Sequence, residues 1–99
     1  MPRESKFQKQ VIERLEETFP GCVVIKNDPR QLQGIPDLLV LYRDTWAGLE
    51  VKRSEDESTQ PNQPYYVDLF NEMSYASFIF PENEERVFDD LQLTFGSRR

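Results

Sequence analysis

Apolar positions in the first part of the chain follow first a helical and then a strand-like pattern. Phe7, Val11, Ile12, Leu15 and Phe19 recur at helical spacing, which predicts a helix over residues 2–19 that ends at the Pro-Gly pair 20–21. The β-branched residues of segment 21–26 then predict a short strand, and the Asn-Asp-Pro triplet that follows breaks it.

A β-hairpin is predicted over residues 34–53. Pro36 suits the first residue of a strand, residues 38–42 form an unbroken apolar run, and residues 43–45 supply a turn before the chain returns over 46–52. Alternation of side chains places Glu50 and Lys52 on one face of the returning strand. Antiparallel pairing would bring these two charges back beside Asp37.

The last part of the chain predicts a helix, a strand and a second helix. Residues 62–74 form the first of these helices, residues 76–80 form a strand that Pro81 stops, and the last helix begins at Asn83 and ends at Gly96. The expected inward residues are Tyr66, Leu69, Phe70 and Met73 of the first helix and Val87, Phe88, Leu91 and Phe95 of the second. The predicted order is α-β-β-β-α-β-α in one domain over residues 1–99, with a mobile polar loop at 54–62 and a basic tail at 97–99.

Two polar residues fall on the inward faces of predicted helices. At 100° per residue, Glu4 lies at the centre of the apolar stripe of the first helix, and Gln63 lies on the edge of the stripe of the second. Other acids are expected on solvated surface, namely Glu13, Glu16 and Glu17 of the first helix and Glu55, Asp56 and Glu57 of the polar loop.

Composition narrows the possible chemistry. The 99-residue chain has no histidine and a single cysteine, which excludes Ser-His-Asp hydrolases, Cys-His proteases, histidine-bound zinc and an internal disulfide. Cys22 is therefore expected to be a small buried strand residue. The net charge of −6 argues against a general nucleic-acid coat, although carboxylates filled with divalent cations could still meet a phosphate. No membrane span or signal peptide is visible, so we expect a cytoplasmic protein.

The ordered set of motifs resembles the PD-(D/E)xK nuclease superfamily, and within it the small virus-type replication-repair nucleases (VRR-NUC) of phages. The resemblance rests on Glu4 with Phe7-Gln8, on Gly34-Ile35-Pro36-Asp37, on Glu50-Val51-Lys52, on Gln63, and on residues 76–82. It implies a restriction-endonuclease-like α/β core, in which helices flank a mixed sheet. The loop before Gly34 is not glycine-rich and the loop before Gln63 is unusually acidic, which are departures from the family pattern.

The resemblance also implies roles for individual residues. Asp37 and Glu50 would bind Mg²⁺ or Mn²⁺ with the Val51 carbonyl, and Glu4 would join the shell directly or through water. Lys52 would orient the attacking water and offset charge on the phosphate. Gln63 would support the site through Lys52 or a metal-bound water.

The expected function is metal-dependent hydrolysis of DNA phosphodiesters, endo- or exonucleolytic, in phage replication, recombination or repair and on branched DNA. Contacts to the DNA backbone would come from basic residues, namely Lys6, Lys9, Lys26, Arg30, Arg43 and Arg53. Tyr65 and Tyr66 could stack on bases, although core packing is expected of them. A homodimer is expected and no small-molecule cofactor. Two alternatives stay open, a non-catalytic DNA-binding or assembly module on the same fold and an acidic decoy or inhibitor.

Overall fold

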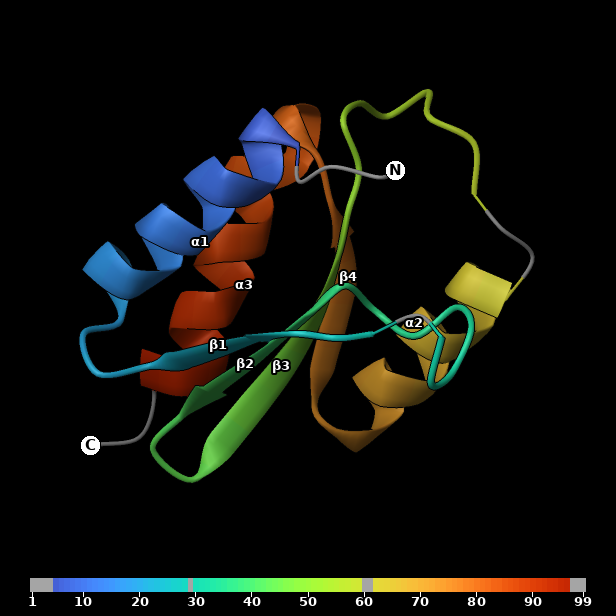
Figure 1. Ribbon diagram of the computed structural model, residues 1–99. Coiled ribbons are helices and arrows are strands. Elements are labelled where there is room, and N and C mark those ends of the chain that lie inside the picture. The colour runs from blue at the N-terminus through green and yellow to red at the C-terminus, as the bar shows by residue number, and fades with distance from the viewer. Residues whose placement is uncertain (1–4, 29, 60–61, 97–99) are drawn as a thin grey trace.

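The computed structural model describes residues 5–28, 30–59 and 62–96, and Figure 1 shows the arrangement of the elements. In chain order these are α1 (Lys6–Thr18), β1 (Val23–Lys26), β2 (Leu38–Tyr42), β3 (Thr45–Val51), α2 (Asn62–Met73), β4 (Tyr75–Ile79), the 3₁₀ turn η1 (Pro81–Asn83) and α3 (Glu84–Gly96). The predicted order α-β-β-β-α-β-α is confirmed, with η1 as an added turn before the last helix.

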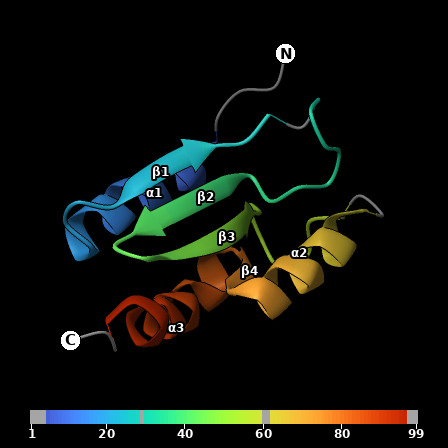
Figure 2. The ribbon, with the colours of Figure 1, turned by 90° about the horizontal axis from the view of Figure 1, so that it is seen from below.

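The four strands form one mixed sheet in the order β1-β2-β3-β4. β1 pairs antiparallel with β2, and β2 pairs antiparallel with β3, so the predicted hairpin is present with Leu38 opposite Leu49. β3 and β4 are parallel, and α2 forms the crossover between them. Helices α1 and α3 lie on one face of the sheet and α2 on the other (Figures 1 and 2).

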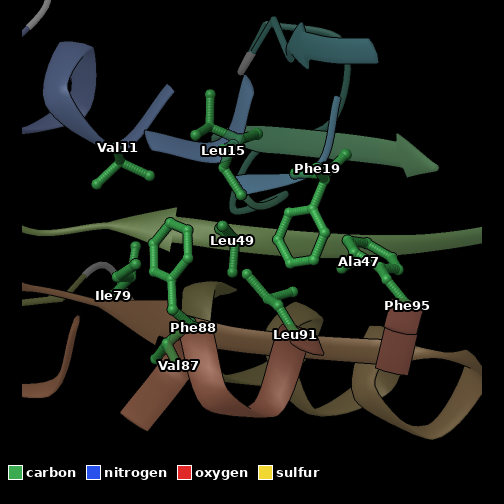
Figure 3. Packing of buried hydrophobic residues seen from close by; sticks show 12 residues of the cluster. Val11, Leu15, Phe19, Ala47, Leu49, Ile79, Val87, Phe88, Leu91 and Phe95 are labelled. Atoms are coloured by element: carbon green, nitrogen blue, oxygen red, sulfur yellow. The ribbon is translucent and has the colours of Figure 1, made fainter. Parts of the chain in front are cut away.

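The hydrophobic core lies between the sheet and the helix pair α1/α3 (Figure 3). Alternate residues of the strands point into it because side chains change face at every residue. Phe19, Tyr42 and Phe95 meet there, with ring centroids 5.1 to 5.5 Å apart. The fully buried residues of this layer include Val11, Leu15, Leu38, Val40, Ala47, Leu49, Ile79, Val87 and Leu91. The inward residues predicted for the last helix are thus confirmed.

Polar contacts fix the two core helices in place. The Ser5 side chain accepts a hydrogen bond from the Gln8 backbone N–H and so caps α1. Arg14 of α1 pairs with Glu84 and Glu85 at the start of α3, at 2.9 and 3.0 Å, and its guanidinium lies over the Phe88 ring. These contacts join two segments that are 70 residues apart in the chain.

Three predictions about burial are wrong in part. Met73 was expected to face inward but is 63% exposed, whereas Val67 is the buried residue of α2. Tyr65 was expected to pack in the core but is 62% exposed. For Met73 the reason is that α2 packs mainly against β3 and β4, so the flank of α2 beside Leu39 and Leu41 stays open. Cys22 precedes β1 and is only half-buried.

Candidate active site

Asp37 stands at the entrance to β2, where local hydrogen bonds hold it. Pro36 before it is buried, and the Asn27 side chain donates to the Pro36 carbonyl at 2.7 Å while the Asn27 backbone N–H donates to the Asp37 carbonyl at 2.8 Å. The Asp37 carboxylate accepts a hydrogen bond from the Val51 N–H at 2.9 Å. The end of β3 therefore lies beside the start of β2, as antiparallel pairing requires.

Glu50 is the most buried charged residue that the structure describes, with 3% of its surface exposed. Its Oε2 accepts a hydrogen bond from the Gln63 side-chain amide in the first turn of α2. Its Oε1 is also buried, and no donor in the described part of the chain reaches it. A buried carboxylate oxygen without a donor is costly, so the ionised form of Glu50 favours a cationic partner at this atom.

The two carboxyl groups lie close enough to alter each other's ionisation. Burial and, after it, the nearby Asp37 charge raise the pKa of Glu50 to about 8, while Lys52 opposes both effects. Burial also raises the pKa of Asp37, against the Val51 N–H and the Lys52 charge, which lower it. The protein alone does not stabilise two negative charges here, whereas a cation between them would.

Lys52 follows Glu50 by two residues and lies on the same side of the sheet. It is 6% exposed, and its backbone N–H donates to the Ile79 carbonyl at 2.9 Å, next to the end of β4. Its Nζ donates to the Ser58 carbonyl at 2.7 Å and lies 5.6 Å from the centre of the Phe78 ring. One buried ammonium thus accompanies the two carboxyl groups.

Gln63 contacts the carboxylate rather than the lysine. The resemblance implied support through Lys52 or a metal-bound water, whereas in the structure the Gln63 amide donates a hydrogen bond to Glu50. This partner follows from the crossover, because α2 starts beside the face of the sheet from which Glu50 projects.

Gly34 brings the loop before β2 against the start of α2. Its φ of +95° is strained for any residue with a side chain, and an added Cβ would stand only 2.4 Å from the Asn62 Cβ. The glycine therefore permits a close approach that sets Gln63 near Glu50. The Gly-x-Pro-Asp motif already marked this glycine in the sequence. The need for a glycine comes from its contact with Asn62, which is distant in the chain.

The acidic loop after β3 is only partly a solvated surface. Glu55 and Asp56 are exposed, as predicted. Glu57 is half-buried, accepts the Arg53 N–H at 2.6 Å and adds to the negative potential at Asp37, so the prediction of a solvated charge is wrong for this residue.

The predicted metal ligand Glu4 lies outside the described residues. Within the described ranges, no group of three or more acidic, cysteine or histidine side chains is placed to hold a metal. The carboxylates that meet there are the pair Asp37 and Glu50.

The predicted DNA-contacting side chains come from several different elements. Lys6 and Lys9 are exposed on α1, and Lys26 is exposed at the end of β1. Arg30 is paired with Asp28 at 3.1 Å, and Arg53 lies 3.7 Å from Glu57. Arg43 lies in the hairpin turn, at the end of β2 opposite Asp37, with its guanidinium over the Tyr42 ring.

No helix in the described ranges is both long and apolar enough to cross a membrane.

Comparison with known proteins supports the fold. No protein-family model matches the chain, and no curated protein sequence matches it either. A solved structure described as a "VRR_NUC domain" is similar in fold, with a TM-score of 0.62 and 24% sequence identity, over 86% of this chain and 97% of the other. The resemblance to a VRR-NUC domain is thus confirmed at the level of the fold, and the chain shares the α/β arrangement of that domain.

Proposed function

We propose that this protein is a divalent-metal-dependent nuclease that hydrolyses DNA phosphodiesters at Asp37, Glu50, Lys52 and Gln63. The observation that carries the proposal is the buried Glu50 Oε1, which no described donor reaches, beside a second carboxylate. Structural acids are normally exposed or paired, so this arrangement favours a bound cation.

The donor set suits Mg²⁺ or Mn²⁺. Both ions prefer oxygen ligands and keep waters in their shells. Asp37, Glu50 and the Val51 carbonyl would hold the ion, and we extend the proposal to Glu4, which lies outside the described residues. When bound, the ion supplies Lewis-acid polarisation of the phosphate and lowers the pKa of a bound water.

The side chains of the chain itself have separate tasks. Gln63 holds Glu50 Oε2 and so leaves Oε1 turned toward the ligand side. The Lys52 ammonium, held at 2.7 Å by the Ser58 carbonyl, orients the attacking water and offsets the charge that develops on the phosphate. Loss of one such preorganised donor typically costs about 3 kcal/mol of barrier.

We further propose a role on branched DNA in phage replication, recombination or repair, in the cytoplasm of the host and as a homodimer. Contacts with the DNA backbone would come from the exposed basic residues, namely Lys6, Lys9, Lys26, Arg30, Arg43 and Arg53. These contacts position a strand without reading its sequence.

The test is cleavage of labelled duplex, flap and four-way junction DNA with Mg²⁺, Mn²⁺ or EDTA. We expect metal-dependent cutting that falls about 100-fold or more in Glu50→Gln and in Lys52→Met. Glu13→Gln on the exposed side of α1 is the matched control and should cut like the unchanged protein.

Three results would contradict the proposal. Equal cutting by Glu50→Gln and the unchanged protein would place the chemistry elsewhere. Binding of DNA without cutting under every metal condition would support a non-catalytic module, and inhibition of another nuclease without DNA binding would support a decoy.

A further inference from the structure

A tight turn over residues 53–58 follows β3 and closes back on the end of that strand. The Arg53 N–H donates to the Glu57 carboxylate at 2.6 Å, and the Glu57 N–H donates to the Ser54 carbonyl at 3.2 Å. These two bonds close the turn on itself. They therefore also set where the next residue, Ser58, lies.

The turn supplies the acceptor for the buried ammonium of the candidate active site. The Lys52 Nζ donates to the Ser58 carbonyl at 2.7 Å and lies 5.6 Å from the centre of the Phe78 ring. Within the described part of the chain, Lys52 forms no ion pair with Asp37 or Glu50, although both carboxyl groups are near enough to sense its charge. The ammonium thus lies beside the two carboxyl groups without closing onto them.

The alternative position for the ammonium is a pair with Glu50. A lysine side chain is long and flexible, and Glu50 projects from the same face of the sheet two residues earlier in the chain. Such a pair would occupy Glu50 Oε1, the buried oxygen that no described donor reaches, and would compete with a metal ion there. A buried ammonium without an acceptor is costly, so the Ser58 carbonyl stabilises the separate position. The place of that carbonyl decides which of the two arrangements the site adopts.

We propose that Glu57 is a positioning residue for Lys52. Its bond to the Arg53 N–H closes the turn and so presents the Ser58 carbonyl to the ammonium. The inference rests on the proposed nuclease function and deepens it, because it adds a residue that holds the lysine at the attacking water and leaves Glu50 to the metal. The role belongs to the acceptor oxygen of Glu57 and not to its charge. The Arg53 guanidinium lies 3.7 Å from the same carboxylate on a side chain that is 77% exposed, so that ion pair contributes little.

Two variants of Glu57 separate the acceptor from the charge. Glu57→Gln keeps an acceptor oxygen in place and removes the charge, whereas Glu57→Asp keeps the charge and withdraws the acceptor by one methylene. Both are polar replacements of a half-buried turn residue, so both should fold. Glu55→Asp is the matched control, because Glu55 lies exposed in the same turn and its contact with Glu82 is made by its backbone N–H.

The first readout is the ¹H–¹³C signal of the Lys52 Cε group, recorded by NMR in metal-free protein labelled with ¹³C-lysine. Loss of the signal in Lys52→Met assigns it, and the nearby Phe78 ring makes the signal depend on where the ammonium lies. We expect Glu57→Asp to shift this signal. Glu57→Gln and Glu55→Asp should leave it where it is in the unchanged protein.

The second readout is cleavage of flap DNA at saturating Mn²⁺. Glu57→Asp should lower kcat at least about 10-fold, because a small misplacement of a catalytic group is enough for losses of that order, and should leave KM for DNA within about two-fold. Glu57→Gln and Glu55→Asp should keep the kcat of the unchanged protein. A fall in kcat at constant KM points to the reacting groups rather than to binding of the DNA.

Three results would overturn the inference. The first is a Lys52 signal that Glu57→Asp leaves in place, and the second is an equal shift in Glu57→Gln, which would assign the effect to charge. The third is cutting by Glu57→Asp at the full kcat, which would leave the nuclease proposal standing. Absence of cutting by the unchanged protein would instead contradict the nuclease proposal, and the Lys52 signal would still decide whether Glu57 places the ammonium.

Discussion

The two faces of the sheet differ sharply although the same strands build them. The face under α1 and α3 is a closed apolar layer, with Leu38, Val40 and Leu49 at 0% exposure. The opposite face carries the Glu50 carboxylate, the Lys52 ammonium and an apolar groove that α2 leaves open. Neighbouring residues of β3 thus have different roles, because Leu49 points into the core and Glu50 points away from it.

This difference indicates that the closed face stabilises the fold, whereas burial of the charged site on the opposite face lowers the stability. Burial of apolar side chains stabilises by about 25 cal/mol per Å². Burial of an ionisable carboxyl opposes folding, and the rise in the pKa of Glu50 to about 8 expresses that cost. Removal of a buried apolar side chain from the closed face should therefore destabilise the fold, whereas neutralisation of Glu50 should stabilise it.

The largest effect is expected from the closed face. Phe95 is fully buried against Phe19 and Tyr42, so Phe95→Ala should lower the free energy of unfolding by about 3–5 kcal/mol through a cavity. Met73→Ala on the open face should change it by less than about 0.5 kcal/mol. Urea unfolding of both variants measures these changes. Similar losses of unfolding free energy in the two variants would contradict the difference between the faces.

The second expected effect is a pH dependence of protein stability in EDTA, caused by Glu50 on the open face. The unfolded Glu50 carboxyl loses its proton near its ordinary pKa of 4.5, whereas the folded one holds it up to a pKa of about 8. Between these values the folded state binds more protons, so stability should fall as the pH rises, by up to about 1.4 kcal/mol per pH unit.

Glu50→Gln should flatten that slope and should be more stable than the unchanged protein at pH 8 in EDTA. Glu13→Gln, an exposed acid of α1, should keep the slope. Thermal unfolding across this pH range measures the difference. A slope that survives in Glu50→Gln would show that another group sets it.

The third expected effect is stabilisation of the folded protein by a metal ion that binds on the open face. A cation that binds only the folded protein adds about 2.7 kcal/mol when its concentration is 100 times its Kd. Mn²⁺ should therefore raise the melting temperature of the unchanged protein and have little effect on Glu50→Gln. A melting temperature that does not respond to millimolar Mn²⁺ would count against the metal site.

The smallest effect compares two glycines with nearly the same backbone angle. Gly21 and Gly34 have φ of +93° and +95°, but an added Cβ meets nothing within 4 Å at Gly21 and lies 2.4 Å from Asn62 at Gly34. Gly21→Ala should lower the free energy of unfolding by about 1 kcal/mol through backbone strain alone. Gly34→Ala should cost about 1 kcal/mol more and should lower cleavage, because α2 and Gln63 must shift. If denaturant unfolding showed the same loss of stability in both variants and Gly34→Ala cleaved DNA like the unchanged protein, the contact with α2 would not constrain the site.

Much of the fold was predictable from local patterns. Helical spacing located α1 and α3, and Pro36 with the apolar run 38–42 located the hairpin, because burial of one face imposes a period on the chain. The pattern did less well for α2, where Met73 was expected to face inward and is exposed. Which flank of a helix is covered depends on how far its neighbours extend, and a single helix does not encode that.

The sequence by itself determined the order of the elements and the alternation that sends Glu50 and Lys52 to one face of β3, because both follow from residue type and spacing. Only the tertiary structure decided that Gln63 binds Glu50, that Oε1 of Glu50 is left without a described donor, and that an apolar groove lined by Trp46 opens beside α2. Those features depend on distances between segments far apart in the chain, and such distances are set by packing rather than by local preference.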